Sequence, residues 1–179
     1  MNILAICGSL RKKSTNMGLL RYAQANAPEG SKITIADLSA VPFYNADISE
    51  KPAAVVTLLE QIGAADALIF GCPEYNYSIA PALKNALDWA SREPDNALLS
   101  GKAVALMGAG GGMGTSRSQY HLRQVCVYIN VHPLNKPEVF VNAFAGTFDA
   151  DGNLTDEKIQ GNIKAQLAAL VDWAKQLKR

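Results

Sequence analysis

The sequence is poor in charge, and its few charges nearly cancel. Charged residues make up 18% of its 179 residues, and 17 Lys and Arg face 16 Asp and Glu, which gives a formal net charge of +1. An average soluble domain carries about 25% charged residues. Nucleic-acid-binding domains usually show a strong basic excess, so the balance argues against that function. It gives no reason to expect an acidic, disordered chain either.

Long hydrophobic runs are missing as well. No stretch approaches the roughly 18 apolar residues of a membrane span, so we expect no membrane partner. No basic residue precedes the short apolar run near the N-terminus, and that run is too short for the core of a signal peptide. These two observations predict a cytoplasmic protein.

Cysteine and histidine are scarce and scattered. Cys7, Cys72 and Cys126 are widely spaced in apolar segments and form no CxxC pair. We expect buried thiols in a reducing compartment, with a redox or metal role as the alternative. The histidines, His121 and His132, have no partner at metal-ligand spacing. No nucleophile–histidine motif is recognisable, so we expect neither a metal site nor a catalytic triad.

Short apolar runs alternate with helix-like segments along the chain. The runs, expected as strands, are Asn2–Cys7, Ile33–Ala36, Ala67–Gly71, Ala103–Gly108 and Glu138–Val141. Helices are expected over Thr15–Ala25, Ala53–Ile62, Ala82–Ser91, Thr115–Ile129 and Thr155–Leu177, with Thr155 as the N-cap of the last. Continuously apolar strands are typical of a parallel sheet covered on both faces. The pattern predicts an α/β fold, a doubly wound five-stranded parallel sheet of order 2-1-3-4-5 with helices on both faces. The length of the chain predicts a single domain over residues 1–179.

Three unusual segments are expected at one edge of this sheet. They cover residues 8–16 (GSLRKKSTN), 72–78 (CPEYNYS) and 108–114 (GAGGGMG), and they follow the first, third and fourth strands. Ligands of such folds bind outside the carboxyl ends of the strands. Because these three strands would be neighbours, the segments would converge on one crevice. That convergence predicts a ligand site.

The first segment has the composition of an anion site. Hydroxyl and amide side chains crowd the start of a helix, whose free N–H groups and dipole favour a phosphate; they are Ser9, Ser14, Thr15 and Asn16. Arg11 would add charge-assisted hydrogen bonds. The segment matches neither a Walker A loop nor a GxGxxG turn, so a phosphomonoester fits it better than a pyrophosphate. An ordinary helix cap with solvated basic side chains is the alternative.

The other two segments suit a flat ring. Pro73 stiffens a loop that carries Tyr75 and Tyr77, whose backbone groups could meet the edge of a ring. Gly110–Gly112 would let a ligand approach the backbone closely. This loop fails the Rossmann spacing, because Met113 stands where the third glycine is required. Aromatic packing or a subunit contact is the alternative for the second segment, and a flexible turn for the third.

Together these segments resemble the NADPH-dependent FMN reductase family of flavodoxin-like proteins, especially its bacterial quinone, chromate and azo-dye reductases. The matching pieces are residues 8–16, 73–92 (PEYNYSIAPALKNALDWASR) and 108–114. The similarity extends, in order, over nearly the whole chain. The resemblance implies bound FMN, NADPH or NADH as the electron donor, and a homodimer or homotetramer. The segments 82–92 and 115–131, which contain two of the predicted helices, are apolar around much of their circumference, which also favours an oligomer.

The resemblance also assigns site residues. It places the FMN phosphate at Ser9, Arg11, Ser14 and Asn16, with Thr15 among them. It places the isoalloxazine ring against Pro73, Glu74, Tyr75, Asn76 and Tyr77, with Gly110, Gly111 and Gly112 at the other side of the ring. No catalytic residue is expected, because the flavin carries the hydride chemistry.

The activity implied is an NAD(P)H-dependent oxidoreductase. Hydride would pass to the bound FMN, and two electrons would then pass to a quinone, chromate, an azo compound or free flavin. The resemblance does not fix the acceptor. The alternative is a flavodoxin-like electron carrier fed by a protein partner. Such carriers are typically strongly acidic, unlike this nearly neutral chain.

Overall fold

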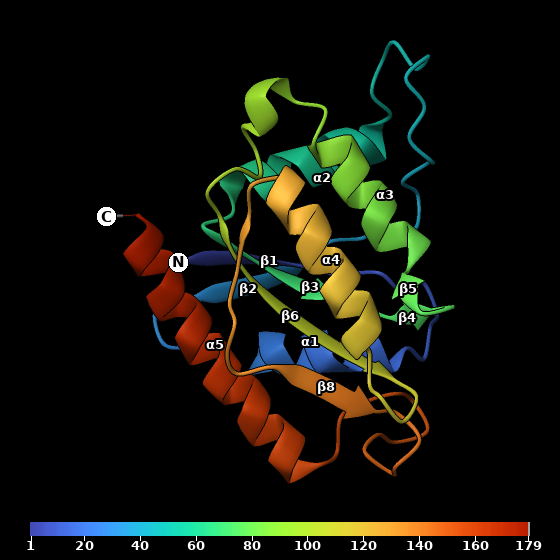
Figure 1. The fold of residues 1–179 in the computed structure, drawn as a ribbon, viewed down its shortest axis with the longest axis vertical. Helices are drawn as coiled ribbons and strands as arrows, with labels where there is room; N and C mark the ends of the chain where they lie inside the picture. The colour runs from blue at the N-terminus through green and yellow to red at the C-terminus, as the bar shows by residue number, and fades with distance from the viewer. Residues whose placement is uncertain (179) are drawn as a thin grey trace.

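A parallel sheet with helices on both faces forms the centre of the structure (Figure 1). The structure is a computed structural model, and it describes residues 1–178 except for the side chain of Asp95. Its strands are β1 (Asn2–Cys7), β2 (Lys32–Ile35), β3 (Ala67–Gly71), β6 (Ala103–Gly110), β7 (His132–Pro133) and β8 (Val139–Asn142). A separate hairpin consists of β4 (Glu74–Tyr75) and β5 (Ser78–Ile79). The helices are α1 (Thr15–Ala25), α2 (Ala53–Ala64), α3 (Pro81–Ala90), α4 (Ser116–Tyr128) and α5 (Glu157–Leu177), with a 3-10 turn at Pro94–Asn96.

The order of the sheet confirms the doubly wound prediction and adds detail to it. The strands run β2-β1-β3-β6-β7, and β8 also pairs with β6, all of them parallel. β7 pairs with the start of β6 at Ala103 and Val104, whereas β8 pairs with its end, from Met107 to Gly110. The five predicted strands therefore keep the order 2-1-3-4-5. The short sixth strand β7 was not predicted, because two residues that include a proline carry no strand pattern.

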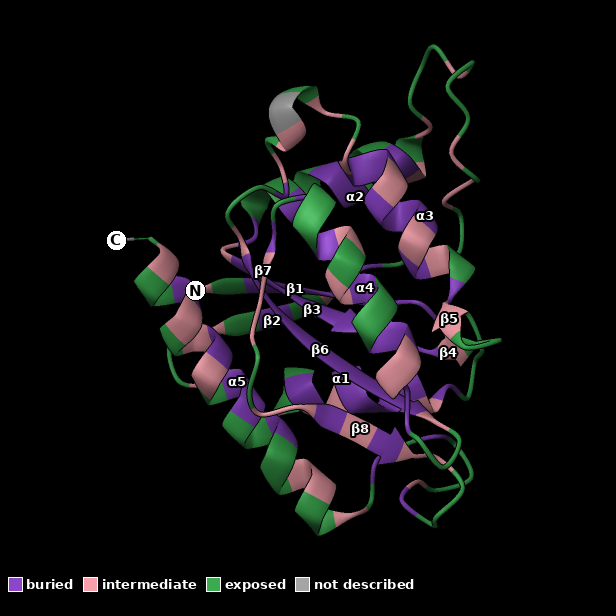
Figure 2. Ribbon diagram, in the orientation of Figure 1, coloured by how far each residue is buried: buried purple, intermediate pink, exposed green. Residues whose placement is uncertain are grey.

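Two apolar layers hold the helices on the sheet. Along β1, Leu4 and Ile6 pack toward α2, α3 and α4, while Ile3, Ala5 and Cys7 pack toward α1 and α5. Strands buried on both sides need such continuously apolar sequences. Figure 1 shows α1 and α5 on one face of the sheet and the other three helices on the opposite face, and Figure 2 shows the central strands buried.

The start of the last helix corrects one prediction. The N-cap of α5 is Asp156, not Thr155, because the Asp156 carboxylate accepts a hydrogen bond from the Ile159 N–H at 2.9 Å. The Thr155 N–H is bound instead to the Thr147 carbonyl. An aspartate at this place also complements the helix dipole.

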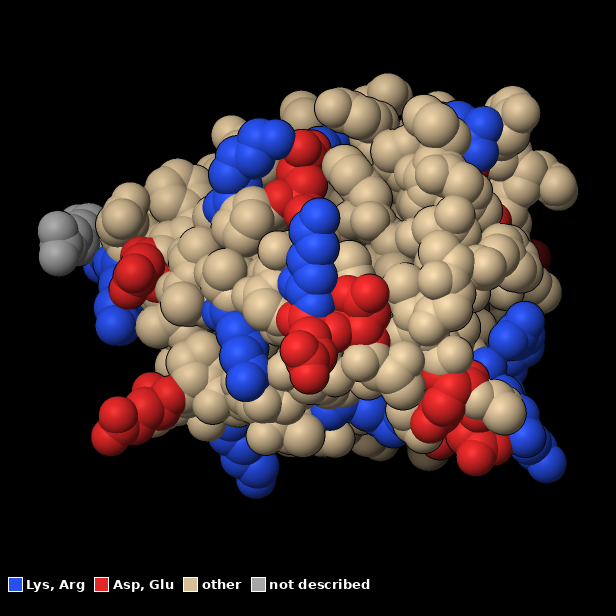
Figure 3. Space-filling model, turned by 90° about the horizontal axis from the view of Figure 1, so that it is seen from below, with Lys and Arg blue, Asp and Glu red and all other residues tan. Residues whose placement is uncertain are grey.

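The surface carries mixed charge. Figure 3 shows basic and acidic side chains interspersed on the face seen from below, in keeping with the net charge of +1. None of the helices within residues 1–178 has the length and apolar character needed to cross a membrane.

Candidate active site

The loop between β1 and α1 is fixed by its own polar side chains. Ser14 caps α1, and its Oγ accepts a hydrogen bond from the Met17 N–H at 3.2 Å. The buried Asn16 amide bonds both backbone groups of Ala109, donating to the carbonyl at 2.8 Å and accepting from the N–H at 2.9 Å. The start of α1 is therefore tied directly to the end of β6, which holds the first and third predicted segments together.

A turn from the C-terminal part of the chain supports α1 from outside. A Cβ on Gly18 would lie 1.9 Å from the Gly152 carbonyl oxygen, so only glycine allows this contact. Arg21 donates hydrogen bonds to Asn153 Oδ1 at 2.8 and 3.1 Å. These contacts bridge more than 130 residues of sequence and fix the direction in which the N-terminus of α1 points.

The β4–β5 hairpin turns at Asn76 and Tyr77, with φ values of 50° and 67°. Two left-handed residues suit the twist of a tight hairpin, but a bulky tyrosine there is strained. The Arg117 guanidinium lies 3.6 Å from the centroid of the Tyr77 ring and forms an ion pair with Glu74. Glu74 also accepts a hydrogen bond from the Ser118 N–H at 3.3 Å. These contacts with α4 hold the hairpin in its strained conformation, and the Glu74 carboxylate raises the pKa of Arg117 above its usual value.

The glycine loop at the end of β6 is tightly packed at Gly110 and open at Gly111 and Gly112. A Cβ on Gly110 would lie 2.4 Å from the Gly114 carbonyl oxygen. A Cβ on Gly111 or Gly112 would meet nothing within 4 Å. Gly110 is therefore required by the packing of the chain itself, whereas Gly111 and Gly112 leave free space beside the backbone.

A cavity of about 410 Å³, which we call the polar cavity, lies where the three segments meet. It is lined by Ser9, Arg11, Ser14, Thr15, Asn16, Pro73, Glu74, Tyr75, Ala109, Gly110, Gly111, Ala143 and Phe144. The lining includes all the predicted site residues except Asn76, Tyr77 and Gly112. Those three lie at the exposed tips of the hairpin and the glycine loop.

Sequence reasoning missed part of this lining. Ala109 lies in β6, and Ala143 and Phe144 follow β8, the fifth predicted strand. The rule that ligands bind beyond the carboxyl ends of parallel strands covers this loop too, and it would have pointed to Ala143 and Phe144.

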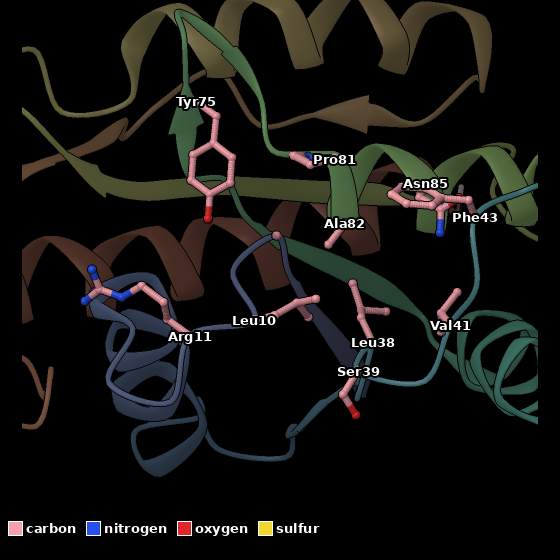
Figure 4. Close-up of a pocket in the computed structure, with 11 residues that line it drawn as sticks. Leu10, Arg11, Leu38, Ser39, Val41, Phe43, Tyr75, Pro81, Ala82 and Asn85 are labelled. Atoms are coloured by element: carbon pink, nitrogen blue, oxygen red, sulfur yellow. The ribbon is translucent and has the colours of Figure 1, made fainter.

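A second cavity of about 450 Å³, which we call the apolar cavity, adjoins the first (Figure 4). It is lined by Gly8, Leu10, Arg11, Leu38, Ser39, Val41, Phe43, Tyr75, Pro81, Ala82 and Asn85. Arg11 and Tyr75 belong to the lining of both cavities. No pattern in the sequence predicts this cavity.

The loop that supplies Leu38 to Phe43 is fastened to α3. Asn85 Oδ1 accepts a hydrogen bond from the Tyr44 N–H, and Asn85 Nδ2 donates one to the Pro42 carbonyl, both at 2.8 Å. Trp89 Nε1 donates to the same carbonyl at 2.8 Å, and the Trp89 ring packs edge-on against Tyr44. One wall of the apolar cavity is therefore held by buried side chains of a helix.

The three thiols, of Cys7, Cys72 and Cys126, are buried. Burial raises the pKa of Cys72 and of Cys126 to about 12, and that of Cys7 also lies above its usual value. They remain protonated at neutral pH. Among the His, Cys, Asp and Glu side chains that the structure describes, no group of three or more could hold a metal ion.

Comparison with known proteins gives a consistent result. Residues 1–146 match the family described as NADPH-dependent FMN reductase. The chain is 49% identical to an NAD(P)H-dependent FMN reductase of Pseudomonas aeruginosa, over 99% of this chain and 97% of that protein. It is 45% identical to an NAD(P)H:quinone oxidoreductase of Solanum tuberosum (99% and 95% covered) and 35% identical to a quinone reductase of Escherichia coli (99% and 97% covered).

A solved structure agrees with these relatives. FerB, a flavoenzyme NAD(P)H:(acceptor) oxidoreductase from Paracoccus denitrificans, superposes with a TM-score of 0.87 at 30% identity, covering 98% of this chain and 97% of that one. The family match, the identity along nearly the full length and the superposition agree. This chain therefore belongs to the NADPH-dependent FMN reductase family.

Proposed function

We propose that this FMN- and NAD(P)H-dependent oxidoreductase delivers the electrons of NAD(P)H to quinones. The observation that carries the proposal is the polar cavity, where a phosphate-type loop, an aromatic hairpin and an open glycine loop meet. Relatives named quinone oxidoreductase or quinone reductase, at 35–45% identity, support quinone as the acceptor. Chromate, azo compounds and free flavin are further candidate acceptors.

The donor set of the polar cavity fits the phosphate of FMN. Ser9 and Ser14 bring hydroxyls to the N-terminus of α1, and Thr15 adds a third. Arg11 folds over the loop, since its guanidinium donates to the Lys13 carbonyl at 2.8 Å, and it supplies the positive charge. Both polar atoms of Asn16 are bound to Ala109, so Asn16 mainly positions α1 and has one amide hydrogen left for a phosphate oxygen.

The rest of the cavity fits a flat ring. We assign the ring to the space between the hairpin, with Pro73 to Tyr77, and the glycine loop, with Gly110 to Gly112. The open space beside Gly111 and Gly112 leaves room for a ring to approach the backbone closely. The contacts of Glu74 and Tyr77 with α4 hold the hairpin in one shape, so the ring would meet a preformed surface.

Catalysis by this chain consists of binding and orientation. Bound FMN supplies the hydride chemistry between the nicotinamide and the acceptor. The residues of the cavity hold the reactants in contact and in orientation, which is the main contribution a protein makes to such a transfer. The Glu74 carboxylate is committed to Arg117 and Ser118 and is therefore a positioning group.

The state of assembly is part of the proposal. Tyr120, Val127 and Tyr128 are more than half exposed on α4, and covering them would favour a homodimer or homotetramer. The apolar residues of α3 do not add to this surface, because Leu87 and Trp89 are buried in the chain's own core. We further propose that residues 1–179 act as one flavin-binding domain in the cytoplasm.

One cuvette experiment tests the proposal. The absorbance spectrum of the purified protein, supplemented with FMN and then gel-filtered, should show the bands of oxidised flavin. Anaerobic NADPH or NADH should bleach them, and menadione should restore them. Flavin that neither nucleotide bleaches would instead indicate an electron carrier fed by a protein partner. A protein that retains no flavin would contradict the assignment of the polar cavity.

A further inference from the structure

The apolar cavity opens beside the polar cavity, and two side chains separate them. Arg11 and Tyr75 line both. In Figure 4, Leu10, Leu38 and Ala82 face one another across the apolar cavity, and Arg11 and Tyr75 stand at one end of it. A molecule that reacts at the polar cavity can therefore extend a substituent past Arg11 and Tyr75 into the apolar cavity.

The lining of the apolar cavity suits an uncharged, apolar substituent. Leu10, Leu38, Val41 and Phe43 supply aliphatic and aromatic carbon. The polar atoms of Asn85 are used in bonds to the backbone of the neighbouring loop. Pockets of about 300–1,000 Å³ with mainly apolar walls are typical of small-molecule sites, and the volume of about 450 Å³ lies in that range.

The same lining is unsuited to anions. Arg11 is the one charged residue among those that line the apolar cavity, and it stands at the end shared with the polar cavity. The phosphates of a nicotinamide nucleotide, or a small oxyanion, would lose hydration and meet no second cationic side chain among the lining residues, where Ser39 offers a single hydroxyl. Phe43 is 76% exposed and Leu10 is 59% exposed, so an apolar substituent would also cover surface that water now contacts.

We propose that the apolar cavity receives the alkyl side chain of a lipophilic quinone whose ring is reduced at the polar cavity. The inference rests on the proposed quinone reductase function and narrows it to quinones with an apolar chain. Each methylene buried there is expected to raise kcat/KM for the acceptor by up to about fourfold.

A series of quinones tests this. The probes are menadione and its 3-alkyl homologues up to hexyl, each assayed with saturating NADPH. The measured quantity is the chain-length ratio, which is kcat/KM for the hexyl compound divided by kcat/KM for menadione. The wild-type ratio should be about tenfold or more. Bleaching of the flavin by NADPH is followed separately in every protein by stopped flow.

Variants of residues that line the apolar cavity test whether the chain-length ratio depends on it. Ala82→Leu places side-chain carbon inside it, and the chain-length ratio should fall to about one. Phe43→Ala removes an exposed wall without disturbing the core and should lower the ratio about threefold or more. The matched control is Ala165→Leu, at an exposed position of helix α5, which should keep the wild-type ratio.

The outcomes separate the two proposals. If NADPH does not bleach the flavin, or if menadione is not reduced, the proposed function fails. If both reactions proceed but the wild-type ratio is about one, this inference alone is overturned; a partner subunit that fills the cavity would give that result. The inference is equally overturned if the ratio is high and both cavity variants preserve it.

Discussion

The polar and apolar cavities have similar volumes, about 410 and 450 Å³, and meet at Arg11 and Tyr75, but they are built in different ways. The polar cavity is assembled from loops that directly follow β1, β3, β6 and β8, a row of neighbouring strands. Its frame includes hydrogen bonds from side chains to the backbone of a central strand, such as those of the Asn16 amide with Ala109 in β6. The apolar cavity depends on the longer connection between β2 and α2, which side chains of α3 hold in place.

This difference separates two kinds of specificity. A cavity built on strand ends and a helix N-terminus keeps its position whenever the sheet forms, which suits a cofactor that every turnover uses. A cavity with one wall formed by a surface loop can change that part of its lining without disturbing the sheet, which suits recognition of one acceptor among several. The predictions below test how far the two cavities are independent.

The largest loss of stability and of FMN affinity is expected from the variant Gly18→Ala. The new Cβ would lie 1.9 Å from the Gly152 carbonyl oxygen, and backbone on both sides leaves no flexible group to move. We expect the free energy of unfolding to fall by about 3 kcal/mol, and FMN affinity to fall with it because the start of α1 is displaced. Urea denaturation and FMN titration of the apoprotein measure the two quantities.

Gly161→Ala is the matched control. Gly161 lies in α5, and a Cβ there would meet nothing within 4 Å. This variant should be more stable than wild type by about 0.5–1 kcal/mol, because alanine is the better helix former. Equal stability of the two variants would show that the turn at Gly152 does not support the polar cavity.

A smaller effect is expected when Arg11, which lines both cavities, is replaced by alanine. A charge-assisted hydrogen bond contributes about 1.5–3 kcal/mol, so the FMN dissociation constant should rise about tenfold to a hundredfold. Lys12→Ala removes the same charge from an exposed neighbour and should change the constant less than about threefold. Equal losses from the two variants would mean that net charge alone, rather than the placement of Arg11, governs FMN binding.

The polar cavity was predictable from the sequence, since its residues follow continuously apolar strands in compact motifs. Ser9 to Asn16 lie within nine residues of one another, and the start of a helix explains why they cluster. The strand order then brought this loop beside Tyr75 and Gly110 without further information. Local patterns and one topological rule predicted most of this half of the site, but the prediction left out Ala143 and Phe144, which follow β8.

Neither the apolar cavity nor the contacts of α4 that hold the β4–β5 hairpin could be predicted in this way. Leu38, Val41 and Phe43 carry no periodic pattern, and their common wall exists only because Asn85 and Trp89 bind the loop backbone. The partners Glu74 and Arg117 are likewise distant in sequence. These contacts depend on the tertiary packing of α3 and α4, which neither composition nor spacing reveals.

The smallest effect is expected from the thiols, which should change the free energy of unfolding only at high pH. We expect them to take no part in the reaction. A pKa near 12 for Cys72 and Cys126 keeps both protonated in the folded state, whereas the unfolded chain ionises near the ordinary value of 9. Below about pH 9 both states are protonated, so these thiols add no pH dependence. Between about pH 9 and 12 the unfolded state binds fewer protons, so the free energy of unfolding should decrease as pH rises.

Two measurements check this. A disulfide reagent such as DTNB at about pH 8 should leave the thiols of the native protein and its NADPH oxidation unchanged, and should label them only after unfolding. Cys126→Val should flatten the fall in the free energy of unfolding between about pH 9 and 11, because one of the ionising groups is gone. Rapid labelling of the native protein would show that a thiol reaches the surface. Loss of NADPH oxidation on labelling would mean that a cysteine takes part in the reaction, and that the two cavities do not by themselves account for turnover.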